Sequence, residues 1–183
     1  MKARLVPSSS LIAIIDIQER LASAMPSAAI ENMVKNVNVI LEAASLLAVP
    51  VLATEQYPKG LGATLPSIAE KLNAPPFDKL TFDACGEPRF VEALSRSGAR
   101  DVVLVGMEAH VCVFQTARAL VRRGYRVIVA ADAVCSRSEE NRVLGLRLAS
   151  DVGASVAPTE TIVFDWLEQA GSDAFKSISK LLR

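Results

Sequence analysis

Short runs of apolar residues alternate with longer amphipathic segments along the chain, and this alternation restricts the fold more than any other feature. Four runs predict buried strands: LIAII (11–15), VPVLA (49–53), VVLV (102–105) and VIVAA (127–131). Two weaker candidates are SVA (155–157) and FDKL (77–80). Aromatic residues make up only 5% of the chain, so the core must be built from Val, Leu, Ile and Ala. Such a core favours parallel strands that are buried on both faces.

The segments between these runs show the apolar spacing of helices. We expect helices at about 28–48, 64–72, 87–97, 111–123, 139–151 and 160–169, with a last one near 173–182. Gly98, Gly124 and Gly153 each lie where a helix should end before the next strand. Alternating strands and helices predict an α/β fold, in which helices cover both faces of a parallel sheet. The 183 residues contain no repeat or linker, so we expect one domain over residues 1–183.

Charge and cysteine content exclude several classes of protein. Lys and Arg together number 20, as do Asp and Glu, so we expect no general attraction to nucleic acid or to an acidic membrane. The three cysteines are odd in number and form no CxxC motif, which argues against a disulfide scaffold and for a reducing compartment. The opening MKARLVPSSS has no apolar signal region, and LIAII is too short to span a bilayer. We therefore expect a cytoplasmic protein.

Polar residues follow the apolar runs directly. In an open parallel sheet, the active site lies beyond the carboxyl ends of the strands. The residues at those ends are Asp16, Thr54, Glu55, Lys79, Met107, Glu108 and Asp132. Because most of them are polar, the sequence predicts a polar site at one edge of the sheet.

His110 is the only histidine of the chain, and it lies two residues before Cys112. Residues at i and i+2 of a turn or helix do not face each other, so His110 is a poor general base for this cysteine. A zinc site needs three or four ligands, and a single histidine argues against one. Cys112 and Arg118 match the C-x5-R spacing of phosphatases, but the intervening VFQTA lacks glycine and continues a helical pattern.

Cys112 lies in the first turn of the helix predicted at 111–123. Unpaired N–H groups and the helix dipole stabilise a thiolate there, so Cys112 can be a nucleophile; a small buried apolar residue is the alternative. Asp16, at a strand end, is the best candidate for its base. Lys79 could balance that carboxylate and stabilise the thiolate. Spacing alone favours structural roles over catalytic ones: Asp16 would cap the next segment, and Lys79 would be a surface lysine.

These segments, taken together, resemble the isochorismatase-like cysteine hydrolases over roughly residues 8–168. The resemblance rests on LIAIIDIQERL, on FDKLTFDA, and on VVLVGMEAHVCVFQTA followed by GYRVIVAADAVCSR. The segments TEQYPKGLG and GMEAHVC most resemble those of the isochorismatase domain-containing subfamily. The resemblance implies a three-layer, Rossmann-like α/β/α fold with a six-stranded parallel sheet in the order 3-2-1-4-5-6.

The same resemblance implies a catalytic triad, which falls by motif on Asp16, Lys79 and Cys112. It also implies a non-proline cis peptide bond between Met107 and Glu108. The N–H groups of Glu108 and Cys112 would then be aimed at one oxyanion. The implied strand order brings the first and fourth strands together, so Asp16 and Cys112 should meet at the switch point of the sheet.

Two departures from known members of the family narrow the expected chemistry. Metal-binding nicotinamidases carry an Asp/His cluster in the loop after the second strand, and here that loop, TEQYPKGLG, has no histidine. We therefore expect no metal and no cofactor. True isochorismatases cleave a vinyl ether and need not use a cysteine, so Cys112 argues for amide-type chemistry. His110 then becomes a residue of the pocket rim or of an interface.

The sequence thus predicts a cysteine-dependent hydrolase that cleaves a small amide or carbamoyl C–N bond through a thioester acyl-enzyme. The substrate is expected to be a small molecule. Gln18, Tyr57 and Phe82 are candidates for the pocket walls, and Arg137 is a candidate for binding a substrate anion.

Two other hypotheses remain open. One is a catalytically quiet interaction protein on the same scaffold; the family commonly forms homo-oligomers, and a mean hydropathy of +0.31 fits a chain that hides apolar surface in interfaces. The other is a thiol redox sensor, in which a low-pKa Cys112 forms a disulfide with Cys85 or Cys135.

Overall fold

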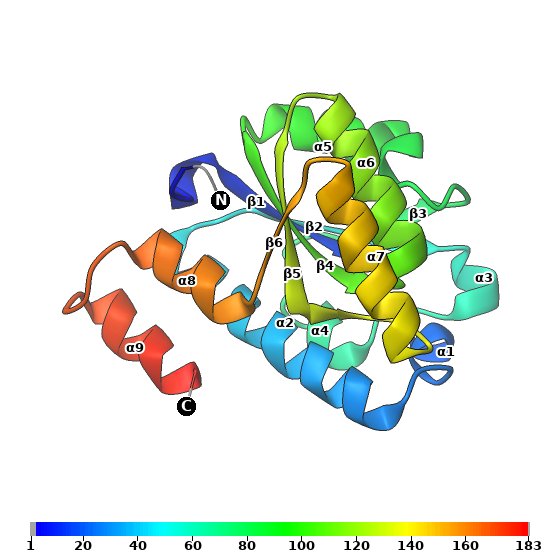
Figure 1. Ribbon diagram of the computed structural model, residues 1–183, viewed down its shortest axis with the longest axis horizontal. Coiled ribbons are helices and arrows are strands. Elements are labelled where there is room, and N and C mark those ends of the chain that lie inside the picture. The colour runs from blue at the N-terminus through cyan, green and yellow to red at the C-terminus, as the bar shows by residue number, and fades with distance from the viewer. Residues whose placement is uncertain (1–2, 183) are drawn as a thin grey trace.

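The protein is built on a single six-stranded parallel sheet, as seen in a computed structural model that describes residues 3–182 (Figure 1). The strand order is β3-β2-β1-β4-β5-β6, and every neighbouring pair is parallel. The strands are β1 (Ser10–Ile15), β2 (Val51–Gln56), β3 (Phe77–Lys79), β4 (Asp101–Met107), β5 (Arg126–Cys135) and β6 (Ser155–Ala157). This confirms the predicted fold class and strand order.

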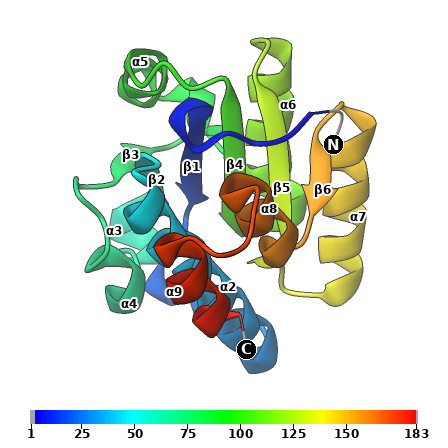
Figure 2. The ribbon, with the colours of Figure 1, turned by 90° about the vertical axis from the view of Figure 1, so that its left-hand side faces the viewer.

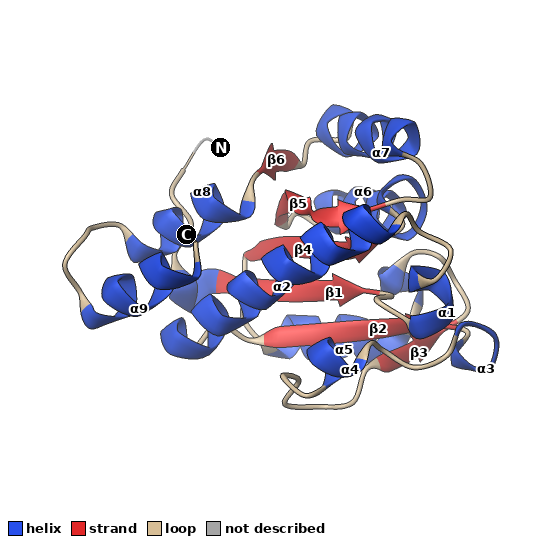
Figure 3. Ribbon diagram, turned by 90° about the horizontal axis from the view of Figure 1, so that it is seen from below, coloured by secondary structure: helices blue, strands red, loops and turns tan. Residues whose placement is uncertain are grey.

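Helices cover both faces of the sheet, as Figure 3 shows. One face packs against α2 (Ser27–Leu47), α8 (Thr159–Leu167) and α9 (Asp173–Leu181). The other face packs against α5 (Pro88–Arg96), α6 (Phe114–Arg122) and α7 (Glu139–Asp151). Each face therefore has its own apolar core, and side chains that alternate along a buried strand such as β1 contribute to both cores in turn.

The predicted helices are confirmed in most of their length, and the exceptions are short elements. The helix expected at 64–72 is only one turn long, α4 (Pro66–Ala69). Single-turn helices that periodicity did not predict are α1 (Glu19–Ala22) and α3 (Pro58–Leu61), together with 3-10 turns at Pro7–Ser9 and Ala84–Gly86. One turn is too short to show a helical period. The three glycines expected at helix ends all have positive φ, between 68° and 101°.

The segment expected as a helix at 111–123 contains two elements. A π-helical turn at Ala109–Val113 comes first, and the regular helix α6 starts only at Phe114. Cys112 therefore lies in the π-turn rather than in the first turn of an α-helix. Single-turn π-helices are frequent at functional sites.

Close contact between β1 and β4 brings the first and fourth strands together at the carboxyl edge. Ile15 of β1 is paired with Gly106 of β4. Gly106 has a φ of 115°, and a Cβ at this position would collide with the carbonyl oxygen of Ile15. Only glycine therefore fits here. Asp16 follows Ile15 and Met107 follows Gly106, so these two residues lie side by side at the carboxyl edge of the sheet.

Within residues 3–182, no helix is long and apolar enough to cross a membrane.

Candidate active site

A buried ion pair joins the ends of two strands. Asp16 follows β1 in the left-handed backbone region, with a φ of 52°, and Lys79 is the last residue of β3. The Lys79 Nζ lies 2.7 Å from Asp16 Oδ2, and neither side chain is exposed to solvent. The Thr54 hydroxyl donates to Asp16 Oδ1 at 2.8 Å. Both oxygens of the carboxylate are thus held by neighbours, which fixes its orientation.

Lys79 donates to three further oxygen atoms. They are Gln56 Oε1 at 2.8 Å and the carbonyl oxygens of Thr81 at 3.2 Å and Phe82 at 3.1 Å. Gln56 was not predicted as a site residue. Its spacing from Thr54 could have indicated it, because residues two apart on a strand share a face of the sheet. The lysine is therefore a fixed counter-ion and not a surface residue.

Cys112 completes the cluster, and its surroundings raise the pKa of its thiol. The residue is 5% exposed. Burial first, and then the negative charge of Asp16, raises the pKa of the Cys112 thiol to about 12, with a hydrogen bond to Asp16 and the charge of Glu108 acting in the same direction. Lys79 opposes them and is outweighed. The expectation that a helix start would stabilise a thiolate is thus wrong, because the buried π-turn lies beside two carboxylates.

The raised pKa of the Cys112 thiol predicts its reactivity. Iodoacetamide should label Cys112 slowly near neutral pH, and the labelling rate should rise about tenfold per pH unit up to about pH 10. The reason is that the thiolate fraction increases about tenfold with each pH unit as long as the pH stays below the pKa of about 12. Peptide mass spectrometry across this pH range measures the rate. A free cysteine, with a reference pKa of about 8.5, serves as the control and should level off earlier. A plateau for Cys112 near neutral pH would show a thiolate that is already formed.

The turn between β4 and α6 carries the remaining predicted groups. The peptide bond between Met107 and Glu108 is cis, as the resemblance implied. The Glu108 carboxylate is buried and accepts hydrogen bonds from Arg137 N at 3.0 Å and Arg137 Nε at 3.2 Å. The Arg137 side chain is otherwise mostly exposed. Its guanidinium therefore lies at the rim of the site, and its role in binding an anion stays a prediction.

The three predicted wall residues occupy different environments. Gln18 is fully buried, and its side-chain amide bonds the backbone of Gln56 and the carbonyl oxygen of Gly62. Gln18 therefore holds the backbone at both ends of the loop after β2. Tyr57 and Phe82 are 51% and 53% exposed, so their rings are accessible to a molecule approaching Lys79. Contact of all three with substrate remains a prediction.

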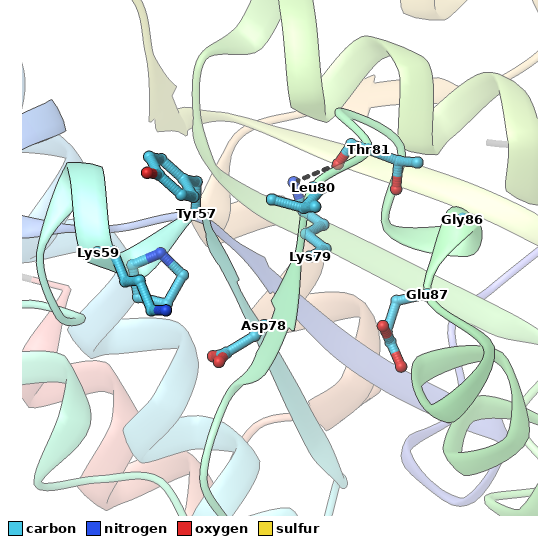
Figure 4. Close-up of a pocket in the computed structure, with 9 residues that line it drawn as sticks. Tyr57, Lys59, Asp78, Lys79, Leu80, Thr81, Gly86 and Glu87 are labelled. Carbon is cyan, nitrogen blue, oxygen red and sulfur yellow. Dashed lines mark hydrogen bonds between the residues drawn. The ribbon is translucent and has the colours of Figure 1, made fainter.

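A hollow of about 490 Å³ lies on the β3 side of the ion pair (Figure 4). Its lining includes Tyr57, Lys79 and Leu80, and it also contains the charged side chains of Lys59 and Glu87. Figure 4 also shows the bond from the Lys79 ammonium to Thr81. Cys112 and Asp16 do not line this hollow. The hollow therefore borders Lys79 and does not reach the other two predicted triad residues.

His110 has a partner other than Cys112. Its Nδ1 lies 3.1 Å from the Ser136 hydroxyl, whereas the charged groups that shift the pKa of the Cys112 thiol are Asp16, Lys79 and Glu108. The helix α7 packs tightly behind this turn: a Cβ on Gly145 would lie 2.6 Å from the backbone of Ala109 and of His110. Glycine thus allows α7 to touch the turn that carries the cysteine.

The other two cysteines give no support to the redox-sensor hypothesis. All three are unpaired and buried. Burial raises the pKa of both Cys85 and Cys135 to about 12, as it does for Cys112. Cys112 and Cys85 belong to the core on one face of the sheet, and Cys135 belongs to the core on the other. Among the described residues, no group of three or more His, Cys, Asp or Glu side chains could hold a metal ion.

Comparison with known proteins gives a family-model match and several similar proteins. A family model described as Isochorismatase domain matches residues 10–161. A protein of Phytophthora sojae named secreted isochorismatase effector Isc1 is 36% identical over 98% of this chain and 87% of its own length. Isochorismatase domain-containing protein 2 of Bos taurus is 34% identical over 98% of this chain and 86% of its own. A solved structure of a protein named MAR1 ribonuclease, from Caenorhabditis elegans, is 36% identical, has a TM-score of 0.91, and covers 98% and 92% of the two chains.

Proposed function

The chain belongs to the isochorismatase family, and from this premise we propose that it is a cysteine hydrolase of small amide or carbamoyl C–N bonds. One observation carries the proposal: a buried thiol lies close enough to the Asp16 carboxylate for that charge to raise its pKa, and the carboxylate is itself paired with a buried lysine. A thiol with a pKa of about 12 needs a base at the moment of attack. Asp16 is the side chain with the largest influence on this pKa after burial itself.

The proposed reaction has two halves, and protons balance in each. Asp16 takes the Sγ proton as sulfur bonds to the carbonyl carbon, and the N–H groups of Glu108 and Cys112 hold the oxyanion. When the C–N bond breaks, Asp16 returns this proton to the leaving nitrogen, and a thioester remains. Water then attacks the thioester, Asp16 accepts its proton, and the proton passes back to sulfur as the acid product leaves. Lys79 balances the charge of Asp16 throughout.

Trapping the thioester tests this chemistry. We expect an acid quench during turnover of small amides and carbamoyl compounds to leave the mass of the acyl group on the peptide that contains Cys112. The Asp16→Asn variant should accumulate no adduct and show no turnover, because its amide cannot accept the thiol proton. Unchanged turnover in that variant would contradict the mechanism. A short RNA in a separate arm tests for the ribonuclease activity that the name of the nematode protein implies.

The cellular compartment and the oligomeric state of the protein are also proposals. Three unpaired cysteines support a reducing compartment such as the cytoplasm, although one relative is named a secreted effector. Exposed apolar side chains on α7 support a homo-oligomer.

A further inference from the structure

Another hollow, of about 440 Å³, lies at the amino edge of the sheet. Asp101 and Arg126, the first residues of β4 and β5, line it together with residues of the N-terminal segment 3–9. Figure 2 shows this segment, in blue, lying across β4 and β5. The candidate active site follows the carboxyl ends of the strands, so the hollow and that site lie at opposite edges of one parallel sheet.

Positive charge exceeds negative charge in this hollow. Its lining contains a single acid, Asp101, and four arginines, which are Arg4, Arg100, Arg123 and Arg126. We call it the arginine hollow. The whole chain has 20 basic residues (Lys and Arg) and 20 acidic ones, so the excess is local. Both oxygens of Asp101 are already occupied, because Arg126 Nε donates to Oδ1 at 2.7 Å and Arg126 Nη2 donates to Oδ2 at 2.6 Å. Asp101 therefore balances the charge of Arg126 alone.

Two of the four arginines hold the N-terminal segment in place. Arg126 donates to the carbonyl oxygens of Ala3 at 2.6 Å and of Arg4 at 2.9 Å. The Arg4 guanidinium donates to the carbonyl oxygen of Asp165 at 3.3 Å and pairs with Glu168 at 3.2 Å. These contacts explain Arg4 and Arg126 as structural residues, and they leave Arg100 and Arg123 to be explained.

Arg100 and Arg123 belong to the short connections that lead into β4 and β5. The two connections are adjacent, since Arg126 N donates to the carbonyl oxygen of Arg100 at 2.9 Å. Both arginines are exposed, and within residues 3–182 neither takes part in an ion pair. Arg123 donates to the carbonyl oxygen of Ala119 at 3.3 Å. A guanidinium has five N–H donors, so this contact leaves most of them available to a ligand.

We propose that the arginine hollow binds a small phosphate monoester through Arg100 and Arg123. The ester carries close to two negative charges near neutral pH, because its second pKa is about 6, and two unpaired guanidinium groups match this charge. The planar forks of N–H donors also match the oxygen atoms of a phosphate.

The size and the remaining lining of the hollow favour an ester over the free ion. A volume of about 440 Å³ lies within the range of small-molecule sites, roughly 300–1,000 Å³. Val6, Ala99 and Tyr125 add apolar surface beside the charges. Apolar lining with a few convergent polar groups is the usual composition of a ligand site, and here it gives the organic part of the ester a surface to contact.

Calorimetric titration of the full chain with phenyl phosphate, at constant ionic strength, tests the proposed site. We expect a Kd of about 1 mM or below. Arg100→Gln and Arg123→Gln should each raise this Kd about tenfold, because each removes charge-assisted hydrogen bonds to the phosphate. Inorganic phosphate should bind more weakly because it lacks the ring. Benzoate should also bind more weakly, because it has the ring but only one negative charge.

Matched controls separate this site from a general attraction of anions. Arg122 is the last residue of α6, directly before Arg123, and it does not line the hollow. Arg122→Gln therefore removes the same charge from the same helix end and should leave the Kd unchanged. Arg137→Gln should leave it unchanged too, since Arg137 contacts Glu108 at the opposite edge of the sheet. Circular dichroism checks that each variant is folded.

Several results would overturn the proposal. One is the absence of any binding of phenyl phosphate up to about 10 mM. Another is an equal loss of affinity in Arg122→Gln or Arg137→Gln, which would mean a general effect of charge or an anion at the candidate active site. Equal affinity for inorganic phosphate would assign the hollow to the free ion, and equal affinity for benzoate would remove the preference for phosphate. None of these measurements depends on hydrolase activity.

Discussion

Replacing Cys112 by alanine should abolish turnover and leave the protein folded. We expect kcat/KM to fall by about 10⁴-fold or more, as when the nucleophile of a catalytic triad is removed. The acyl bond of the proposed mechanism forms on this thiol, and without it Asp16 has no proton to accept. The lost sulfur leaves a small cavity, which should lower the free energy of unfolding by only about 1–2 kcal/mol.

The two other cysteines provide matched controls for this variant. Cys85→Ala and Cys135→Ala each remove a buried thiol whose pKa is also raised to about 12. Both variants should therefore show a similar loss of stability and near wild-type turnover. Kinetics on any substrate that the trapping experiment identifies, together with urea unfolding, measures both quantities. Retained activity in Cys112→Ala would exclude cysteine catalysis.

Replacing Lys79 by methionine should have the largest effect on stability. Asp16 would keep its buried position without its counter-ion, and breaking a buried pair in this way costs about 3–5 kcal/mol. Gln56 Oε1 and two carbonyl oxygens would lose their donor as well. Urea unfolding of Lys79→Met should therefore show a large drop in the midpoint, and turnover should be lost.

A double variant distinguishes lost charge balance from lost packing. Asp16→Asn combined with Lys79→Met removes both charges and should regain most of the stability lost in Lys79→Met, while remaining inactive. The exposed pair of Lys71 and Glu42 gives the matched surface control. Lys71→Met should change the free energy of unfolding by about 1 kcal/mol or less. Equal destabilisation in the single and double variants would mean that the charge of Asp16 is not what Lys79 supports.

The fold was predictable because buried parallel strands are encoded by uninterrupted apolar runs. The polar ends of these strands were harder to delimit. β2 was expected to end at residue 53, yet it continues to Gln56 because Thr54 and Gln56 turn their side chains toward Asp16 and Lys79. β5 likewise continues past Asp132, whose carboxylate accepts from the backbone of Thr159. A strand that ends in a polar site extends further than its hydrophobicity indicates.

The pKa of the Cys112 thiol was not predictable from local sequence. A helix start favours a thiolate, and sequence position alone suggested one at Cys112. The opposing influences on the pKa of this thiol are burial, which depends on the whole sheet, and then the charges of Asp16, which is remote in the chain, and of Glu108. The π-turn was equally hidden, because its one extra residue leaves the apolar spacing of 111–123 nearly unchanged. The spacing of Gln56 from Thr54 shows its face of the strand, but its place beside Lys79 depends on the register between β2 and β3.

The placement of β1 between β2 and β4 has a consequence for synthesis of the chain on the ribosome. Asp16 is made early, but its neighbour Cys112 follows β4, which pairs with β1 only after the intervening helices and two strands have been made. Contacts between segments this distant slow folding, because closing the loop between them costs entropy before any contact forms. A nascent chain that ends before residue 112 carries Asp16 and Lys79 without the proposed nucleophile. Under the proposed mechanism, turnover can therefore begin only after four of the six strands have been made.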